Sequence, residues 1–207
     1  MARIFITGSA DGLGQLAAQE LIRDGHEVTI HARSKERGEQ ALKSLPGAKG
    51  VLIADLSDIA QTKSLAEQAN EAGAFDVVIH NAGVYQTTTE NLLNVNTLAP
   101  YILTARMNRP KRLIYLSSGM HLSGEPGNIN QPSYADTKLH MVMLAKALAR
   151  KWPEVYANAV DPGWVPTKMG GTGAPDDLEQ GYQTQVWLAT SDEPAAKVSG
   201  QYFHHQK

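Results

Sequence analysis

Short apolar runs alternate with longer amphipathic segments along the whole chain of 207 residues. The apolar runs predict strands at residues 3–7, 26–32, 50–54, 75–80, 112–116, 156–160 and 201–203. The segments between them predict helices at 15–23, 35–45, 58–71, 134–151 and 178–190. Strands separated by helices form right-handed parallel β-α-β units. The sequence therefore predicts an α/β fold, a Rossmann-type doubly wound parallel β-sheet flanked by helices on both faces.

No repeat, low-complexity tract or linker divides the chain, so we expect a single domain over residues 1–207. The formal net charge of −2 gives no bulk attraction to nucleic acid or to an anionic membrane. The absence of cysteine excludes disulfides and thiolate chemistry. The first apolar run is too short for a signal peptide or a membrane span, so we expect a cytoplasmic protein that binds neither nucleic acid nor membrane.

A glycine-rich turn separates the first predicted strand from the first predicted helix. It reads Thr7-Gly8-Ser9-Ala10-Asp11-Gly12-Leu13-Gly14. Glycines permit a tight turn and let backbone N–H groups approach a phosphate, and the next helix presents its positive end to that charge. Its place in the first β-α unit predicts a dinucleotide pyrophosphate site. A tight turn without a ligand is the alternative.

Tyr134 and Lys138 are four residues apart at the start of a predicted helix, so their side chains share one face. A free phenol has a pKa near ~10 and is a poor base at neutral pH. A nearby ammonium stabilises the phenolate, so the pair is suited to proton transfer between an alcohol and a carbonyl. The spacing alone is usual for a surface helix, but here it follows Ser117-Ser118 at the end of the fifth predicted strand.

These features resemble the classical branch of the short-chain dehydrogenase/reductase family, and the resemblance spans nearly the whole chain in family order. Its motifs are the glycine turn, His80-Asn81-Ala82-Gly83, Asn94-Val95-Asn96, Ser117-Ser118, the Tyr134 and Lys138 pair, and Asp161-Pro162-Gly163-Trp164-Val165-Pro166-Thr167. The resemblance implies a nicotinamide-dependent oxidoreductase acting on CH–OH and C=O groups.

The resemblance also implies the role of each catalytic residue. Tyr134 is the general acid in reduction and the base in oxidation, and Lys138 lowers its pKa and binds the nicotinamide ribose. Ser118 polarises the substrate oxygen, with Ser117 as the alternative position. Asn96 supports a proton relay through water, with Asn94 as the competing position. The implied cofactor-binding residues are Gly8, Ser9, Asp11, Gly12, Leu13, Gly14, Arg33, Asp55, Leu56, Asn81, Ala82, Gly83, Tyr134, Lys138, Pro162, Gly163, Val165 and Thr167.

The residues after the second predicted strand favour NADP(H) over NAD(H). An NAD site needs a carboxylate there for the ribose 2′-hydroxyl, whereas this chain has Arg33, which can pair with a 2′-phosphate. The alternative is that Arg33 and Lys35 only begin a solvated helix. Asp11 is a departure, since many NADP-binding relatives carry a basic residue at that position.

We therefore expect an NADP(H)-dependent oxidoreductase that transfers a hydride between nicotinamide and a small carbonyl or alcohol substrate. The alternative is a catalytically silent NADP-binding regulatory protein. The seven histidines share no ligand spacing, so no metal site is expected. The resemblance allows a homo-oligomer. The short stretch between Gly83 and Arg112 predicts a trimmed helix, and the short segment after Thr167 predicts a small substrate lid.

Overall fold

The computed structural model describes all residues from Met1 to Lys207 and contains one sheet of seven parallel strands. The strands are β1 (Arg3–Ile6), β2 (Glu27–Ala32), β3 (Gly50–Ile53), β4 (Val77–His80), β5 (Arg112–Leu116), β6 (Tyr156–Asp161) and β7 (Tyr202–His204). Their order is β3-β2-β1-β4-β5-β6-β7, so the chain changes direction between β1 and β4. The carboxyl ends of the strands at such a switch point form the crevice in which doubly wound sheets bind ligands.

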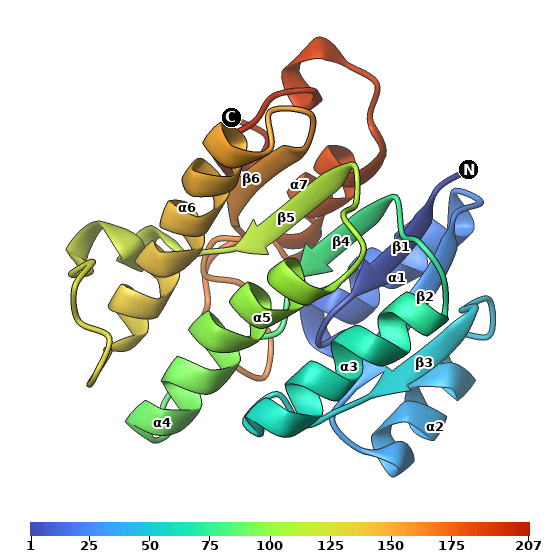
Figure 1. Cartoon of the computed structure of the whole chain (residues 1–207), viewed down its shortest axis with the longest axis horizontal. Coiled ribbons are helices and arrows are strands. Elements are labelled where there is room, and N and C mark those ends of the chain that lie inside the picture. Colours follow the sequence, from blue (N-terminus) through green and yellow to red (C-terminus); the bar gives the residue numbers. More distant parts are fainter.

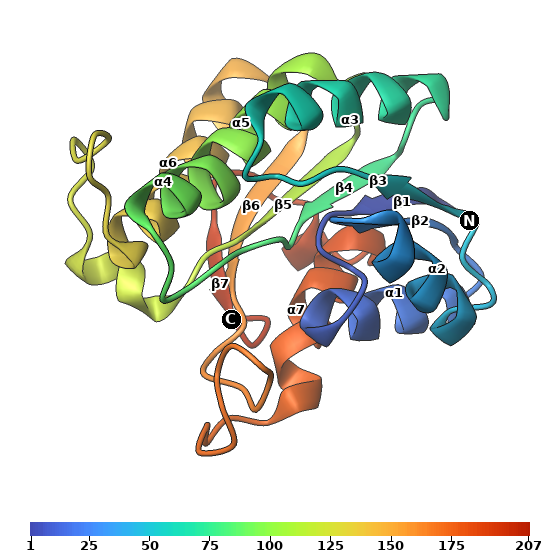
Figure 2. The same cartoon turned by 90° about the horizontal axis from the view of Figure 1, so that it is seen from below.

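Helices cover both faces of the sheet (Figures 1 and 2). One face carries α1 (Gly12–Arg23), α2 (Lys35–Ser44) and α7 (Leu178–Thr190), and the other carries α3 (Ile59–Glu71), α5 (Ala99–Arg106) and α6 (Tyr134–Lys151). Each face has its own apolar core, with Leu21 and Ile30 in the first and Leu65 and Leu103 in the second. The α/β fold predicted from the alternating pattern is confirmed.

The segment between β4 and β5 forms a continuous helical stretch with an irregular centre. It begins as the single turn α4 (Thr89–Asn91), continues as a π-helix over Leu92–Leu98 and ends as α5. A π-helix adds a residue to each turn and is often found at functional sites. Here it contains Asn96, which is 1% exposed.

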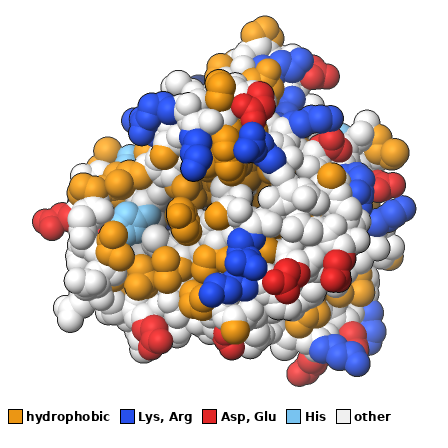
Figure 3. Space-filling model, viewed as in Figure 1, with side chains coloured by type: hydrophobic (Ala, Val, Ile, Leu, Met, Phe, Trp, Pro, Cys, Tyr) orange, Lys and Arg blue, Asp and Glu red, His pale blue; other side chains and the backbone are white.

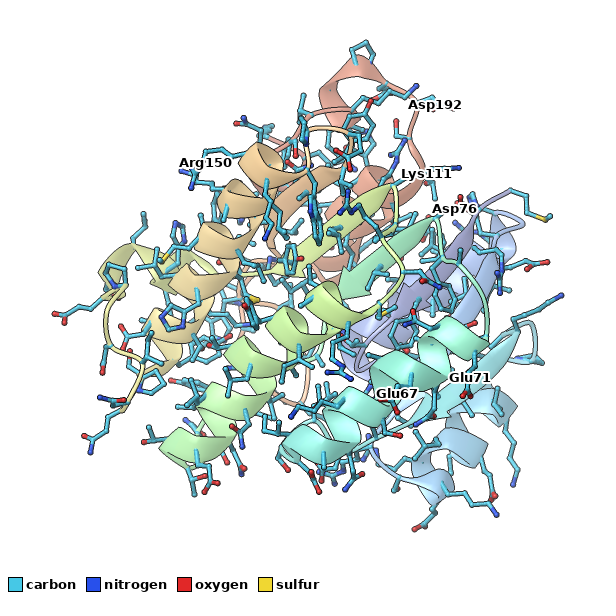
Figure 4. The ribbon with its side chains drawn as sticks, in the orientation of Figure 1. Glu67, Glu71, Asp76, Lys111, Arg150 and Asp192 are labelled. Atoms are coloured by element: carbon cyan, nitrogen blue, oxygen red, sulfur yellow. The ribbon has the colours of Figure 1, made fainter.

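An ion pair and a backbone bond join three strands at the amino edge of the sheet, opposite the crevice. Asp76 accepts a hydrogen bond of 2.9 Å from the backbone N–H of Arg3, and it pairs with Lys111 at 2.9 Å. Figure 4 labels Asp76 and Lys111 where β4 and β5 begin. The Arg3 N–H therefore donates to the side chain of Asp76 and not to a backbone carbonyl of the neighbouring strand. The strand β4 starts at Val77, rather than at residue 75 as predicted.

A groove of about 680 Å³ lies between α5 and α6 and shares no residue with the crevice. Tyr101, Ile129 and Met143 on its walls are among the exposed large apolar side chains. Figure 3 shows apolar side chains gathered over this part of the surface. None of the helices combines the length and the apolar composition that crossing a bilayer requires.

Candidate active site

A cleft of about 580 Å³ lies at the carboxyl edge of the sheet, beyond the ends of the adjacent strands β1 and β4. Most of the predicted site residues line it, namely Gly8, Asp11, Gly12, Leu13, Arg33, Asp55, Leu56, Asn81, Ala82, Gly83, Tyr134, Lys138, Pro162 and Thr167. Ser9, Gly14, Asn96, Ser118, Gly163 and Val165 are not among the lining residues. The structure therefore brings predicted residues from six separate segments of the chain together around one cavity.

The glycine turn has the close contacts that its sequence predicts. Gly8 has φ +63°, and a Cβ there would lie 2.8 Å from the Cα of Ala82. A Cβ on Gly14 would collide with the amide of Asn81. Gly12 has φ +58° and no neighbour within 4 Å of its Cβ position, so its backbone faces open space. The turn thus combines tight packing on one side with an accessible backbone on the other.

The amino end of α1 is free to bind an anion. Asp11 is the N-cap residue, but its side chain makes no hydrogen bond to the first amides of the helix. These N–H groups have no partner within the helix, and the helix dipole adds positive charge there. The turn and helix end therefore fit the pyrophosphate of a dinucleotide cofactor.

His31 supports this turn from β2, and the sequence prediction missed it. Its Nδ1 accepts a hydrogen bond of 2.9 Å from Gly8 N–H, and its Nε2 lies 3.0 Å from the carbonyl oxygen of Ala54. These partners require a neutral ring that donates through Nε2. Burial lowers the pKa of His31 to about 4, which keeps the ring in that state. The available signal was a histidine within an otherwise apolar strand beside the phosphate turn.

Two further cations lie at the end of the cleft that Asp11 and Arg33 line. Arg37 pairs with Asp11 at 2.6 Å, and Lys168 approaches the same carboxylate at 3.1 Å. Arg33 is exposed and lines the cleft, as predicted, whereas Lys35 is exposed but does not line it. Arg37 and Lys168 were missed because Asp11 is 26 and 157 residues away from them, respectively, along the chain.

Asp55 and Leu56 line the same end of the cleft after β3. One carboxylate oxygen of Asp55 accepts hydrogen bonds from the backbone N–H and the hydroxyl of Ser57, at 2.9 and 2.7 Å. An isolated aspartate after a strand commonly forms a turn of this kind, so these bonds give Asp55 a structural role. Leu56 is buried beneath it and contributes an apolar wall.

Tyr134 and Lys138 enter the cleft together from the first turns of α6. A capping box fixes the start of this helix, since Ser133 and Asp136 bond reciprocally to each other's backbone N–H. Lys138 is 5% exposed, and its ammonium nitrogen donates to the carbonyl oxygen of Leu116 at 3.0 Å. The same nitrogen lies 3.3 Å from the Cβ position of Gly83, which explains the small residue there.

The pKa of Tyr134 is raised to about 12, opposite to the direction expected from the sequence. Burial is the main cause, and the charges of Asp161 and Tyr85 add to it. Burial also lowers the pKa of Lys138 to about 8, with Asp161 opposing that shift. Desolvation of both groups therefore outweighs the stabilisation of the phenolate by the ammonium. The phenol retains its proton at neutral pH, as a general acid must.

Ser117 and Ser118 have different environments at the end of β5. Ser117 is buried, and its hydroxyl donates to the carbonyl oxygen of Lys138 at 2.8 Å. Ser118 is partly exposed, and its hydroxyl accepts only a long bond of 3.3 Å from Met120 N–H. Ser118 thus keeps its own proton free for a ligand, whereas Ser117 lines the cleft but commits its hydroxyl to a backbone carbonyl.

Asn96 joins the cleft to α6 through its side chain. Its Oδ1 accepts from Val84 N–H at 2.8 Å, and its Nδ2 donates to the Val84 carbonyl oxygen and to the Thr137 hydroxyl. Asn94, the competing position, donates to the carbonyl oxygen of Ser57 instead. Asn96 therefore holds the loop after β4 against the helix that carries Tyr134 and Lys138.

Asp161, at the end of β6, is another residue that the sequence prediction missed. Its Oδ1 accepts from Gly163 N–H at 2.9 Å, and its Oδ2 accepts from the Tyr202 hydroxyl at 2.9 Å. His204 approaches Oδ2 at 3.3 Å. The bond to Gly163, which has φ +79°, fixes the start of the segment that ends at Thr167.

Tyr85 is a further neighbour that was not predicted. Its ring meets that of Tyr134 edge to face, with centroids 4.8 Å apart, and it is 41% exposed. No three acidic or histidine side chains gather where they could ligate a metal.

Comparisons with known proteins agree with this geometry. A family model described as short chain dehydrogenase matches residues 2–177. The chain is 47% identical to an uncharacterized oxidoreductase of Emericella nidulans, over 98% of this chain and 86% of that protein. It is 43% identical to the short-chain dehydrogenase chry4 of Gibberella zeae, over 100% of this chain and 87% of that protein.

Solved structures share the same fold. The crystal structure of a blue fluorescent protein from a metagenomic library, in complex with NADPH, superposes with a TM-score of 0.83. The two sequences are 23% identical, and the match covers 98% of this chain and 95% of the other.

Proposed function

This chain belongs to the short-chain dehydrogenase family of oxidoreductases, which act on alcohol and carbonyl groups with a nicotinamide cofactor, and from that premise we propose that it is NADP(H)-dependent. The observation that carries the proposal is one continuous cleft with Tyr134 and Lys138 at one end and Arg33 and Arg37 at the other. The bound cofactor supplies or accepts the hydride. A small carbonyl or alcohol compound is the substrate.

The chain's own residues bind and orient the reactants and move the proton. The turn around Gly12 and the amino end of α1 bind the pyrophosphate, and Arg33 pairs with the 2′-phosphate. Pro162 and Thr167, which line the cleft, would hold the nicotinamide. The protonated phenol of Tyr134 gives its proton to the substrate oxygen in reduction, while the free hydroxyl of Ser118 stabilises the charge on that oxygen.

A catalytically silent regulatory protein is not favoured. Tyr134 and Lys138 both line the cleft, and Ser118, whose hydroxyl donates to no protein group, directly follows Ser117, which also lines it. Three relatives that are 42–47% identical to this chain are named as an oxidoreductase and short-chain dehydrogenases.

The test follows NADPH absorbance with purified protein against a panel of aldehydes, ketones and diketones, with NADH in parallel. We expect oxidation of NADPH with at least one carbonyl class and a preference over NADH. Tyr134→Phe should lower turnover by a factor on the order of 10²–10⁴, while Tyr101→Phe, on the exposed face of α5, keeps it. Equal use of NADH would contradict the Arg33 assignment, and unchanged turnover in Tyr134→Phe would contradict the assigned acid.

A further inference from the structure

Three charged side chains meet at the adenosine end of the cleft, and we call them the Asp11 cluster: Asp11, Arg37 and Lys168. One carboxylate oxygen, Oδ2 of Asp11, accepts from Nη2 of Arg37 at 2.6 Å and from Nζ of Lys168 at 3.1 Å. The three residues come from the glycine turn, the first turn of α2 and the segment after β6, and all three line the cleft. The Asp11 carboxylate thus binds two of the cations, Arg37 and Lys168, that line the proposed cofactor cleft.

The two arginines at this corner are in different states. Arg33 directly follows β2, the place where doubly wound folds hold the ribose 2′-position, and its guanidinium makes no hydrogen bond or ion pair with the protein. Arg37, four residues later, has its backbone N–H bonded to the Ser34 hydroxyl and its guanidinium bonded to Asp11. A phosphate at this corner meets one free guanidinium and one that a carboxylate already holds.

The charge of Asp11 distinguishes the two nicotinamide dinucleotides. A phosphomonoester carries a charge of about −1.5 to −2 at pH 7, and like charges within the Debye length of about 8 Å repel each other at physiological salt. A ribose 2′-hydroxyl carries no charge, and it can donate a hydrogen bond to a carboxylate. The same side chain therefore opposes the phosphorylated ribose and tolerates the free one.

We propose that Asp11 is a specificity-determining residue of the cofactor cleft, whose carboxylate competes with the 2′-phosphate for Arg37 and moderates the preference for NADP(H). The inference rests on the proposed function, since it assumes a dinucleotide in this cleft. Lys168 neutralises part of the Asp11 charge and so weakens the competition. The protein uses both cofactors more evenly than its two arginines alone would allow.

The first test measures binding without turnover. Calorimetry at fixed ionic strength compares adenosine 2′,5′-bisphosphate with 5′-AMP, on the wild type and on Asp11→Asn. We expect Asp11→Asn to bind the bisphosphate about tenfold more tightly, equivalent to about 1.4 kcal/mol, and to bind 5′-AMP with little change. Asp24→Asn is the matched control, because it removes the same charge at the other end of α1, where Asp24 pairs with Arg23.

Two more variants identify the cause. In the Asp11→Asn background, Arg37→Gln should abolish the gain, because the freed guanidinium is its source. Lys168→Met should lower the ratio of bisphosphate to 5′-AMP affinity, because it leaves Asp11 less neutralised while the Arg37 pair remains. A gain in Lys168→Met would show that loosening of the segment after β6 is responsible and would overturn the proposal.

The outcomes distinguish failure of the role of Asp11 from failure of the proposed cofactor site. An unchanged affinity ratio in Asp11→Asn, with both compounds bound, contradicts the role of Asp11 alone. Failure of the wild type to bind either compound contradicts the cofactor site and the inference with it. The ratio of kcat/KM for NADPH over NADH should rise in Asp11→Asn by the same factor as the binding ratio.

Discussion

The ammonium nitrogen of Lys138 lies 5.4 Å from the centre of the Tyr134 ring. Neither group has a carboxylate in hydrogen-bond contact, and burial disfavours the charged form of each. The catalytic pair is therefore held in an environment that opposes its ionisation, which costs folding stability and prepares the site for a ligand that adds polar partners.

We expect Lys138→Met to stabilise the fold while it abolishes activity. The pKa of Lys138 falls from 10.5 to about 8 in the folded protein, so the unfolded chain binds this proton more tightly. The ammonium therefore destabilises the fold below pH 8, and the cost disappears as the pH rises toward 10.5. Loss of the charge should raise the free energy of unfolding at pH 7 by about 1–3 kcal/mol.

Urea unfolding at pH 7 and pH 10 measures this difference. The gain should be smaller at pH 10, and Lys146→Met, an exposed position on the same helix, should show neither effect. Destabilisation of Lys138→Met at pH 7 would mean that the bond to Leu116 outweighs the burial of the charge.

Asp161→Asn should move the pH dependence of catalysis. The Asp161 charge raises the pKa of Lys138, so its removal lets burial lower that pKa further below 8. If Lys138 acts as a cation, the basic limb of kcat/KM for the cofactor, which reports the free enzyme, shifts to lower pH by about half to one pH unit. Asp192→Asn removes an exposed carboxylate and should leave the profile unchanged. A shift to higher pH would contradict the assigned electrostatics.

Two buried histidines should make the protein sensitive to acid. Burial lowers the pKa of His31 to about 4 and that of His80 to about 3, from 6.5. As the pH falls below 6.5, the unfolded chain takes up protons that the folded protein refuses, so stability declines until the folded pKa is reached. The loss should reach about 3 kcal/mol for His31 and about 5 kcal/mol for His80.

His80→Phe isolates one of these contributions. The Phe ring keeps the stacking on Tyr115, whose centroid lies 4.8 Å from that of His80, but it cannot be protonated. The free energy of unfolding should then fall less steeply between pH 6.5 and pH 4. The Thr104 hydroxyl lies 3.2 Å from His80 Nε2 and 2.7 Å from the Tyr115 hydroxyl. Tyr115→Phe removes the second of these contacts and should keep the wild-type slope. Identical slopes in all three proteins would rule His80 out as a cause.

Gly8 and Gly12 should respond differently to alanine. Both have positive φ, which costs about 1–2 kcal/mol for an L-residue. Only Gly8 also has a close neighbour, Ala82, so Gly8→Ala should lose about 3 kcal/mol or more in thermal or urea unfolding. Gly12→Ala should lose only the smaller amount, yet weaken cofactor binding, because its methyl group would stand in the open cleft. Equal destabilisation would contradict this difference in packing.

For elements with strong local signals, the sequence predicted the first and last residues correctly. The helices α6 and α7 begin and end where the pattern placed them, and their N-caps Ser133 and Asp177 accept bonds from the first turn. The predicted start of β4 was two residues too early, because the side chain of Asp76 accepts a hydrogen bond from the backbone of Arg3 on β1. The periodicity of apolar residues reflects neighbours along the chain, so it cannot reveal a contact between residues that are distant in sequence.

The candidate site divides in the same way. Tyr134, Lys138 and the glycine turn, which short spacings singled out in the sequence, line one cleft in the structure. Lys168 and Asp161 act on residues far away in sequence, so only the fold reveals them. The direction of the Tyr134 pKa shift was wrong for the same reason, since it is set by how deeply the phenol is buried.

Both polar atoms of the Asn96 side chain are hydrogen-bonded, which has a consequence for how ligands enter and leave. Every hydrogen-bonding atom of its amide group is used to connect the loop at Val84 with α6 at Thr137, so these parts move as one body. The opposite wall, from Pro162 to Met169, makes one side-chain hydrogen bond to the glycine turn, from the exposed Lys168. We therefore expect exchange of cofactor and substrate to proceed by displacement of that wall, with the proton-transferring half of the cleft stationary throughout each cycle.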